Sequence, residues 1–229
     1  DFTTGTFKHG RDSPLACDLL VIDEASMIDT FLMYQLLRAV PAGARVVIIG
    51  DANQLPSIGP GSILKDLIAA NSVPKTELTD IFRQAKGSRI VVNAHRVNHG
   101  EMPSCKNFAT SDFFFLECHE PEEVRQCILD LVATRLPAKF GFDPKRDIQV
   151  LIPMRKGPIG IEQLNSDLQA KLTPTGDGKS LRGLRIGDKV MQIKNNYDKE
   201  VFNGDIGIVT DIDLEELKLT VTMDEQAVD

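Results

Sequence analysis

The sequence predicts an α/β protein with a parallel sheet, followed by a small antiparallel β module. Short continuous apolar runs at 19–22 and 45–49 alternate with segments of helical periodicity. That alternation is typical of parallel strands joined by helical crossovers. After about Thr173 the pattern changes to short alternating strands separated by glycine-bearing turns, which predicts an antiparallel barrel-like module.

The first half of the chain supplies the strands and helices of the expected sheet. Apolar residues recur at helical spacing through 29–40, and Pro41 ends that helix. We expect a hairpin at 2–9, strands at 19–22, 45–49 and 73–78, and helices at 29–40, 62–70 and 88–98.

The second half begins with a further α/β unit. Acidic residues in the first turn of a helix suit its dipole, and Glu122 and Glu123 stand at the start of the longest helical segment. We expect strands at 113–116 and 147–152, helices at 121–136 and 159–171, and short β strands at 189–193, 207–209 and 218–223. Asn203-Gly204 is a strong signal for a tight turn.

Composition places few limits on function. The 229 residues are 42% hydrophobic. Their net charge of −7 argues against a protein that coats nucleic acid with its whole surface. Segment 155–199, however, holds nine Lys or Arg against five Asp or Glu. This basic stretch has two equally good explanations: a surface that follows a phosphate backbone, or an ordinary solvent-exposed face.

The four cysteines lack the CxxC spacing of zinc sites, and no apolar run approaches the ~20 residues of a membrane span. We therefore expect a cytoplasmic protein in a reducing compartment, with no membrane partner.

Asp23 and Glu24 follow the first buried strand directly. A carboxylate at the carboxyl end of a parallel strand lies where α/β sheets bind ligands. There Asp23 can hold Mg²⁺, largely through water, and Glu24 can orient or deprotonate an attacking water. The alternative is that Asp23 caps the helix that begins near residue 29.

A second polar turn, Gly50-Asp51-Ala52-Asn53-Gln54, follows the next strand. Gly50 permits a close backbone approach, and Gln54 is placed to contact a γ-phosphate and its attacking water. Gln54 could instead bond to its own loop backbone. The segment 56–61 that follows is a rigid turn bearing two glycines, which either couples the site to a neighbouring surface or shapes a loop.

Arg83 lies in a third motif, Leu78 to Gln84. Its planar guanidinium suits phosphate oxygens, although a surface ion pair is the commoner fate of an arginine.

In order and spacing, these three motifs resemble motifs II, III and IV of superfamily 1 DNA helicases. The similarity is greatest to the RecD-like family, which comprises the exodeoxyribonuclease V alpha subunit and its stand-alone relatives. It continues through Arg89 to His95, Gln149 to Gly157 and Gly187 to Gly207, and so extends over nearly the whole chain.

The resemblance implies an ATP site with Mg²⁺ at Asp23, water activation by Glu24, γ-phosphate sensing by Gln54 and charge stabilisation by Arg83. Gly50 and Asp51 would complete the ATP-binding set. It also implies contacts with single-stranded DNA. The residues expected to make them are Pro153, Arg155, Lys156, Asn165, Asn195, Asn196 and Tyr197. For the last three, turn formation is an equally good explanation.

The resemblance further implies three regions: 1–85 as the C-terminal half of a first RecA-like motor domain, 86–180 as part of a second, and 181–229 as an SH3-like β-barrel insertion. The sequence lacks a GxxxxGK[ST] phosphate-binding loop and helicase motifs V and VI. We therefore expect a fragment that hydrolyses little ATP by itself.

The expected function is that of an ATP-dependent helicase. It would move 5′ to 3′ on single-stranded DNA and unwind duplexes, with a role in recombinational repair and with partner subunits of a helicase–nuclease complex. Two alternatives remain: the helicase region of a conjugative relaxase, and a non-catalytic DNA-binding module.

Overall fold

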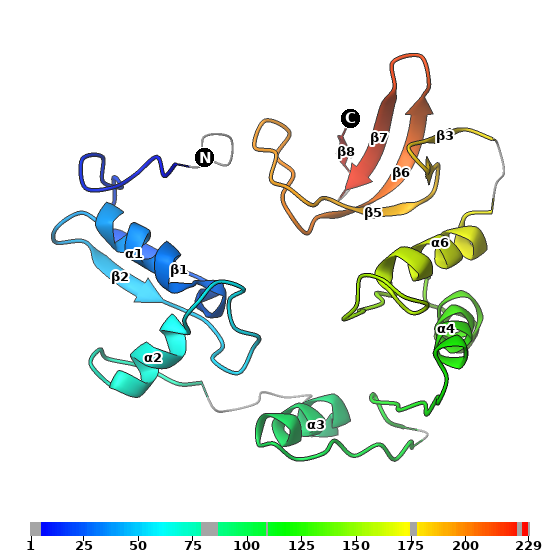
Figure 1. Cartoon of the computed structure of the whole chain (residues 1–229), viewed down its shortest axis with the longest axis horizontal. Helices are drawn as coiled ribbons and strands as arrows, with labels where there is room; N and C mark the ends of the chain where they lie inside the picture. Colours follow the sequence, from blue (N-terminus) through cyan, green and yellow to red (C-terminus); the bar gives the residue numbers. More distant parts are fainter. Residues whose placement is uncertain (1–5, 79–86, 109, 175–177, 224–225, 229) are drawn as a thin grey trace. The chain divides into compact units, whose positions relative to one another are not determined.

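A computed structural model of the chain describes residues 6–78, 87–108, 110–174, 178–223 and 226–228. The chain divides into two compact units, residues 1–115 and 116–229. Figure 1 colours the first unit from blue to green and the second from green to red. Among the described residues, no helix combines the length and the apolar character that crossing a membrane requires.

The first unit is built on a parallel strand pair. Strand β1 (Leu19–Ile22) and strand β2 (Arg45–Ile48) pair in parallel, with Leu19 opposite Arg45 and Ile22 opposite Ile48. The connection between them contains the short helix η1 (Ala25–Met27) and helix α1 (Thr30–Ala39). This strand–helix–strand unit confirms the parallel α/β arrangement predicted from the alternating pattern.

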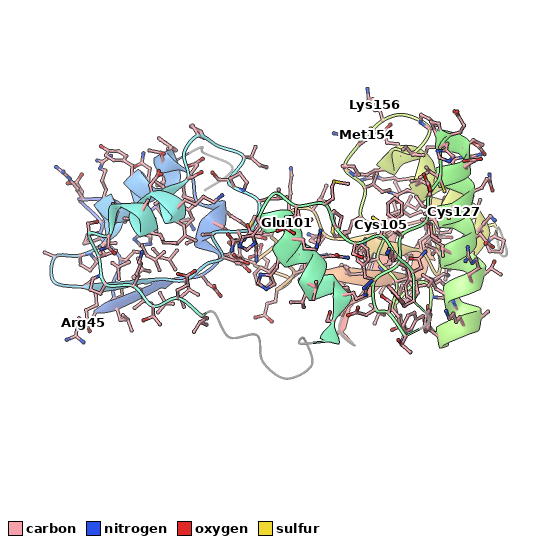
Figure 2. The ribbon with its side chains drawn as sticks, turned by 90° about the horizontal axis from the view of Figure 1, so that it is seen from below. Arg45, Glu101, Cys105, Cys127, Met154 and Lys156 are labelled. Atoms are coloured by element: carbon pink, nitrogen blue, oxygen red, sulfur yellow. The ribbon has the colours of Figure 1, made fainter. Side chains whose placement is uncertain are left out.

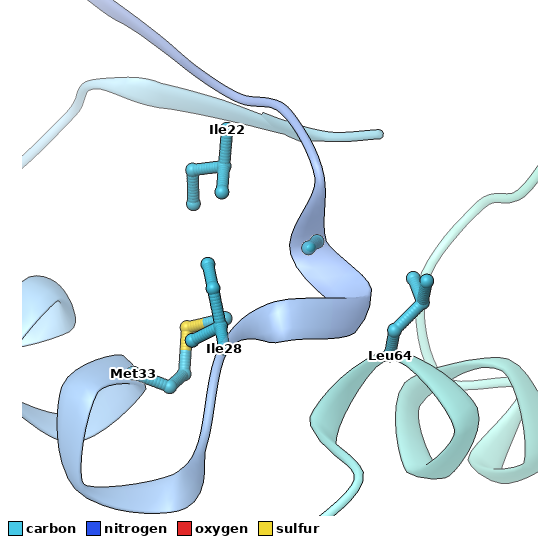
Figure 3. Packing of buried hydrophobic residues seen from close by; sticks show 5 residues of the cluster. Ile22, Ile28, Met33 and Leu64 are labelled. Carbon is cyan, nitrogen blue, oxygen red and sulfur yellow. The ribbon is translucent and has the colours of Figure 1, made fainter. Parts of the chain in front are cut away.

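The core of the first unit lies between this strand pair and the helices beside it. Figure 3 shows side chains of Ile22, Ile28, Met33 and Leu64, which together with Ala25 form the buried cluster. Leu64 comes from helix α2 (Ile63–Ala70). The strand pair is therefore anchored on one side by α1 and α2, which fixes where its carboxyl ends lie.

Helix α3 (Arg89–Asn98) is held by the segment that follows it. The side chain of Asn93 is buried; it donates to the carbonyl oxygen of Ser104 (3.2 Å) and accepts from the backbone nitrogen of Ser104 (2.8 Å). Asp112 accepts hydrogen bonds from the Ser88 hydroxyl and from the backbone nitrogen of Arg89 at the helix N-terminus. Residues 101–108 and 110–112 thus form a strap along α3.

The second unit starts with three consecutive helical segments, α4 (Pro121–Asp130), the π-helical η3 (Leu131–Arg135) and α5 (Leu136–Phe140). Helix α6 (Ile161–Leu172) packs beside them. Arg125 on α4 pairs with Asp167 on α6 at 2.6 Å and with Glu122 at 2.9 Å. The Arg125–Asp167 pair ties α4 to α6, and the Glu122 pair lies within α4.

The β module follows α6. Strands β3 (Ser180–Leu181) and β4 (Leu184–Arg185) form a hairpin. An antiparallel sheet of order β5–β6–β7–β8 comes next, with bounds Lys189–Met191, Ile206–Asp213, Lys218–Met223 and Gln226–Val228. The strand register shifts between Val209 and Asp211, where β6 pairs with β7. Within the described residues the sheet is open rather than closed into a barrel.

Asp188 joins α6 to this module. It is 5% exposed and accepts hydrogen bonds from the Gln169 side chain on α6 and from the backbone nitrogen of Arg185. Lys189 donates from Nζ to the carbonyl oxygen of Ile148 at 2.9 Å, and burial lowers the pKa of this lysine. The sheet is therefore fastened to the helical part of its own unit by buried polar contacts.

Three predicted strands are wrong. Segments 73–78, 113–116 and 147–152 contain no strand among their described residues, and Leu151 is 87% exposed. An apolar run becomes a strand only when another strand pairs with it, and no described segment does so here. The predicted hairpin at 2–9 falls partly outside the described residues, and residues 6–9 are not paired as a strand.

Candidate active site

The two parallel strands end side by side, and their polar turns begin at the same edge. The nitrogen of Ile49 donates to the carbonyl oxygen of Ile22 (2.7 Å), and the nitrogen of Ala25 donates to the carbonyl oxygen of Ile49 (2.9 Å). These bonds extend the contact beyond the paired residues. They join the turn carrying Asp23 and Glu24 to the turn that starts at Gly50.

Glu24 has an unusual backbone conformation. Its φ of 51° and ψ of 40° lie in the left-handed region, which costs a residue with a side chain about 1–2 kcal/mol. Its nitrogen donates to Oδ1 of Asp23 at 2.8 Å. Such strain gathers at functional positions, and the Asp23 and Glu24 carboxylates on either side of this peptide bond are both exposed.

Asp23 does not cap the following helix. The N-cap of α1 is Asp29, whose Oδ1 accepts from the nitrogen of Leu32 at 2.7 Å. The capping alternative for Asp23 is therefore excluded. Of the two Asp23 carboxylate oxygens, Oδ1 accepts the local bond from Glu24, and no described group bonds to Oδ2.

This arrangement fits the mode in which Mg²⁺ usually binds nucleotide enzymes. Among the described residues, no three His, Cys, Asp or Glu side chains gather into a metal cage. Mg²⁺ commonly keeps several waters and takes one or two carboxylates plus substrate phosphates. A single exposed Asp23 at a strand end meets that requirement without further protein ligands.

Gly50 is required by the close approach of the two turns. A Cβ placed on Gly50 would lie 2.9 Å from the backbone nitrogen of Ala25 and 2.9 Å from Cδ2 of Leu64. Real Cβ atoms are not found that near to backbone atoms, so glycine alone fits without displacement. The sequence prediction of a close backbone approach at Gly50 is confirmed by this geometry.

Asp51 shapes the turn that presents Gln54. Its Oδ1 accepts from the nitrogen of Asn53 at 2.8 Å, and its carbonyl oxygen accepts from the nitrogen of Gln54 at 3.2 Å. The Gln54 side chain is exposed, and it makes no hydrogen bond with any described group. The alternative that the Gln54 side chain bonds to its own loop is therefore not what the structure shows.

The glycine-bearing turn 56–61 rests on the start of α1. The nitrogen of Thr30 donates to the carbonyl oxygen of Pro60 at 3.0 Å. A Cβ on Gly59 would overlap the Asp29 carboxylate, and one on Gly61 would overlap the Thr30 hydroxyl. The turn thus connects the loop after β2 to the N-terminus of α1. Helix α1 itself comes after the Asp23-Glu24 turn in the sequence.

A shallow surface depression, called here the pocket, lies between these turns and α2. The residues around it are Ser26, Ala52, Gln54, Pro56, Ser62, Leu64 and Lys65. Sequence reasoning missed Ser26 and Lys65. The position of Ser26, two residues after Glu24 in the same motif, was the signal that could have drawn attention to it.

Arg83 lies outside the described residues. Its expected role at the γ-phosphate therefore stays a prediction.

The predicted DNA-contacting residues all lie in the second unit, in two loops and on one helix. The loop before α6 carries Arg155 and Lys156, and Figure 2 shows Lys156 at its outer edge. Arg155 is highly exposed and pairs with Glu162 at 3.4 Å. The nitrogens of Ile161 and Glu162 donate to carbonyl oxygens of this loop. Those bonds fix the loop against the first turn of α6.

Pro153 and Asn165 are exposed on either side of that turn, Pro153 in the loop and Asn165 on α6. Neither makes a side-chain hydrogen bond with a described group. Their side chains are therefore accessible to a strand of nucleic acid, and their contact with one stays a prediction.

The loop after β5 combines turn bonds with an exposed ring. Oδ1 of Asn195 accepts from the nitrogen of Asn203 at 2.8 Å, and Oδ1 of Asn196 accepts from the nitrogens of Asp198 and Lys199 at 3.2 Å each. Turn formation thus engages both asparagine oxygens.

The Tyr197 ring is 71% exposed and stands edge to face with Phe202 at 5.9 Å. Phe202 supports the ring from one side and was not predicted. The exposed part of Tyr197 is available for base stacking.

Comparison with known families matches the first unit and the C-terminal part of the second. Residues 3–114 match the family model described as an AAA domain. Residues 164–223, which include most of α6 and strands β3 to β7, match the SH3 domain of ATP-dependent RecD-like DNA helicases. The chain belongs to the RecD-like helicase family. The RecA-like α/β fold and the SH3-like module predicted from the sequence are thereby confirmed.

Several characterised proteins are similar to this RecD-like chain. It is 38% identical over 230 residues to the ATP-dependent RecD2 DNA helicase of Deinococcus radiodurans. The alignment covers 97% of the chain and 29% of that helicase. It is 27% identical to the RecBCD enzyme subunit RecD of Mycolicibacterium smegmatis, over 90% of the chain and 39% of that subunit. The chain therefore spans less than half of either relative.

Solved structures of Pif1 helicases also resemble the RecD-like chain. A Bacteroides Pif1 helicase in complex with ADP-AlF3 and single-stranded DNA is 19% identical over 93% of the chain and 52% of that protein, with a TM-score of 0.45. A Pif1 structure describing DNA unwinding at forked duplexes is 21% identical over 92% of the chain and 52% of that protein, with a TM-score of 0.49.

Proposed function

We propose that this chain forms part of an ATP-dependent DNA helicase, supplying the carboxylates and the phosphate sensor of its ATP site and part of its DNA-binding surface. The observation that carries the proposal is the adjacency of the two strand ends. There the bond from Ala25 to Ile49 holds the Asp23-Glu24 turn against the turn that presents Gln54. The 38% identity to a RecD2 helicase supports it.

The side chains divide the work of hydrolysis. Asp23 would hold Mg²⁺, and this ion, when bound, would neutralise charge on the phosphates. Glu24 accepts a proton from the attacking water, and Gln54 orients that water against the γ-phosphate. Arg83 is proposed to stabilise the charge that develops there.

We propose that the parent protein is longer than this chain, which spans 29% of the length of the RecD2 relative. We propose the domain division 1–85, 86–180 and 181–229, movement 5′ to 3′, and a cytoplasmic role in recombinational repair. Partner subunits of a helicase–nuclease complex are part of the same proposal, since RecD relatives are named as RecBCD subunits.

The test uses the longer gene product that carries this segment. We expect ATP hydrolysis stimulated by single-stranded DNA, and a loss of at least about 100-fold in Glu24→Gln, the scale of a missing general base. Equilibrium binding of ATP should persist in this variant, because glutamine keeps the size of the side chain. Full activity of Glu24→Gln would contradict the assignment. DNA binding without hydrolysis in the wild type would favour the non-catalytic module.

Strand binding can be tested on the 229-residue chain itself. We expect fluorescence anisotropy to show binding to a single-stranded oligonucleotide that weakens as salt rises, because counterions are released from the phosphates. Lys156→Gln should reduce the slope of log affinity against log salt by about 0.7 if one phosphate contact is lost. The control is Lys75→Gln, since Lys75 lies in the first unit and donates to the carbonyl oxygen of Ile68. Equal slopes for Lys156→Gln and wild type would show that Lys156 does not contact a DNA phosphate.

A further inference from the structure

Ser26 carries a buried hydroxyl without a partner. Its Oγ is inaccessible to solvent, and of the buried side-chain nitrogen and oxygen atoms among the described residues, it is the one that lacks a hydrogen bond. Native proteins pair almost all such atoms, with protein groups or with ordered water. The Ser26 hydroxyl is therefore a buried polar group that is available to bond a neighbouring polar side chain.

The neighbours are the residues of the pocket beside the strand ends. Ser26 belongs to η1, directly after the Asp23-Glu24 turn, whereas Gln54 belongs to the turn after β2, and both line this pocket. Ser62 and Lys65 contribute the other polar groups. The pocket thus brings a buried hydroxyl and the proposed phosphate sensor to one place, from two adjacent strands.

Gln54 is chemically the best match for Ser26 among these groups. Its carboxamide offers two donors and an acceptor, and a hydroxyl offers one donor and two acceptor positions. The Gln54 side chain is exposed and makes no hydrogen bond with any described group. Gln54 lines the same pocket as Ser26, and its side chain has three rotatable bonds.

We propose that Ser26 is a positioning residue for Gln54. Its hydroxyl bonds the Gln54 carboxamide and limits it to one orientation at the carboxyl edge, beside Asp23 and Glu24. A Gln54 carboxamide held in one rotamer is already oriented toward the γ-phosphate and the attacking water. Such orientation affects the rate of hydrolysis, because small misplacements of reacting groups lower rates strongly. The consequence for catalysis depends on the proposed ATPase function, whereas the bond itself does not.

The bond is tested in the 229-residue chain by NMR of the Gln54 side-chain amide. Hydrogen exchange at this amide should be slower in wild type and in Ser26→Thr, which keeps a hydroxyl, than in Ser26→Ala. Ser62→Ala is the control, because Ser62 lines the same pocket and its side chain does not cap α2. Identical Gln54 exchange in wild type and Ser26→Ala overturns the proposal. A change only in Ser62→Ala also overturns it.

The catalytic consequence is tested in the longer gene product. We expect Ser26→Ala to lower kcat for ATP hydrolysis about tenfold, the effect of one orienting hydrogen bond, with KM for ATP changed less than about twofold. Ser26→Thr should restore most of kcat. If the wild type shows no hydrolysis, the proposed function fails, while the NMR result still decides the contact. If kcat is unchanged in Ser26→Ala although the wild type is active, the positioning role is rejected.

Discussion

The backbone nitrogen of Ala25 donates a hydrogen bond to the carbonyl oxygen of Ile49 at 2.9 Å, beyond the last paired residues of β1 and β2. This bond places the turn after one strand directly against the turn after the next. It explains why Gly50 follows Ile49, because a side chain there would meet the nitrogen of Ala25.

Gly50→Ala should destabilise the chain by about 1–3 kcal/mol, the usual cost of overpacking a close contact. The added Cβ would lie 2.9 Å from backbone, which cannot rotate away. Chemical denaturation measures the change in the free energy of unfolding. Gly10→Ala serves as the control, since its Cβ would have no atom within 4 Å. Equal stability of both variants would contradict the close approach.

Glu24→Gly should leave the chain about 1 kcal/mol more stable than Glu24→Ala, because glycine adopts the left-handed conformation without steric cost. Both variants lack the carboxylate, so the comparison isolates the backbone at φ 51°. Thermal or chemical unfolding of the two proteins gives the difference. An alanine variant as stable as the glycine variant would show that the left-handed conformation is not retained.

Asn93→Ala should cost about 2–4 kcal/mol, since it removes two hydrogen bonds and leaves the backbone groups of Ser104 without partners. Asn98→Ala on the same helix is the matched control, because Asn98 is exposed. Urea unfolding compares the two. A small and equal loss in both variants would show that the segment around Ser104 does not depend on Asn93.

Asp112 should make stability depend on pH in the acid range. The Ser88 hydroxyl, together with backbone donors including Arg89, lowers the pKa of the Asp112 carboxyl. Its contribution is therefore present above the unfolded pKa of about 3.9 and is lost as pH falls through the lower folded pKa. We expect Asp112→Asn to be less stable than wild type at pH 6, with the gap shrinking toward pH 2. A gap independent of pH would argue that the charge is not involved.

Local patterns predicted most elements of both units. Apolar periodicity ended by Pro41 located α1, the helix expected at 88–98 matches α3, and continuous apolar runs located β1 and β2 within a residue of their ends. The apolar segments 113–116 and 147–152 carried the same local signal but form no strand. Strand formation is decided by a partner elsewhere in the chain, which a local pattern does not contain.

Around the candidate active site, the sequence by itself determined which residue types stand at the two strand ends: carboxylates after β1, and glycine, aspartate and glutamine after β2. It also determined the RecD-like family, because the motifs recur in a fixed order. Only the tertiary structure decided that Ala25 bonds to Ile49, that Asp29 rather than Asp23 caps α1, and that the hydroxyl of Ser26 is buried without a partner in the pocket that Gln54 also lines. Hydrogen-bond satisfaction and burial depend on groups distant in sequence, and they are defined only when the chain has folded.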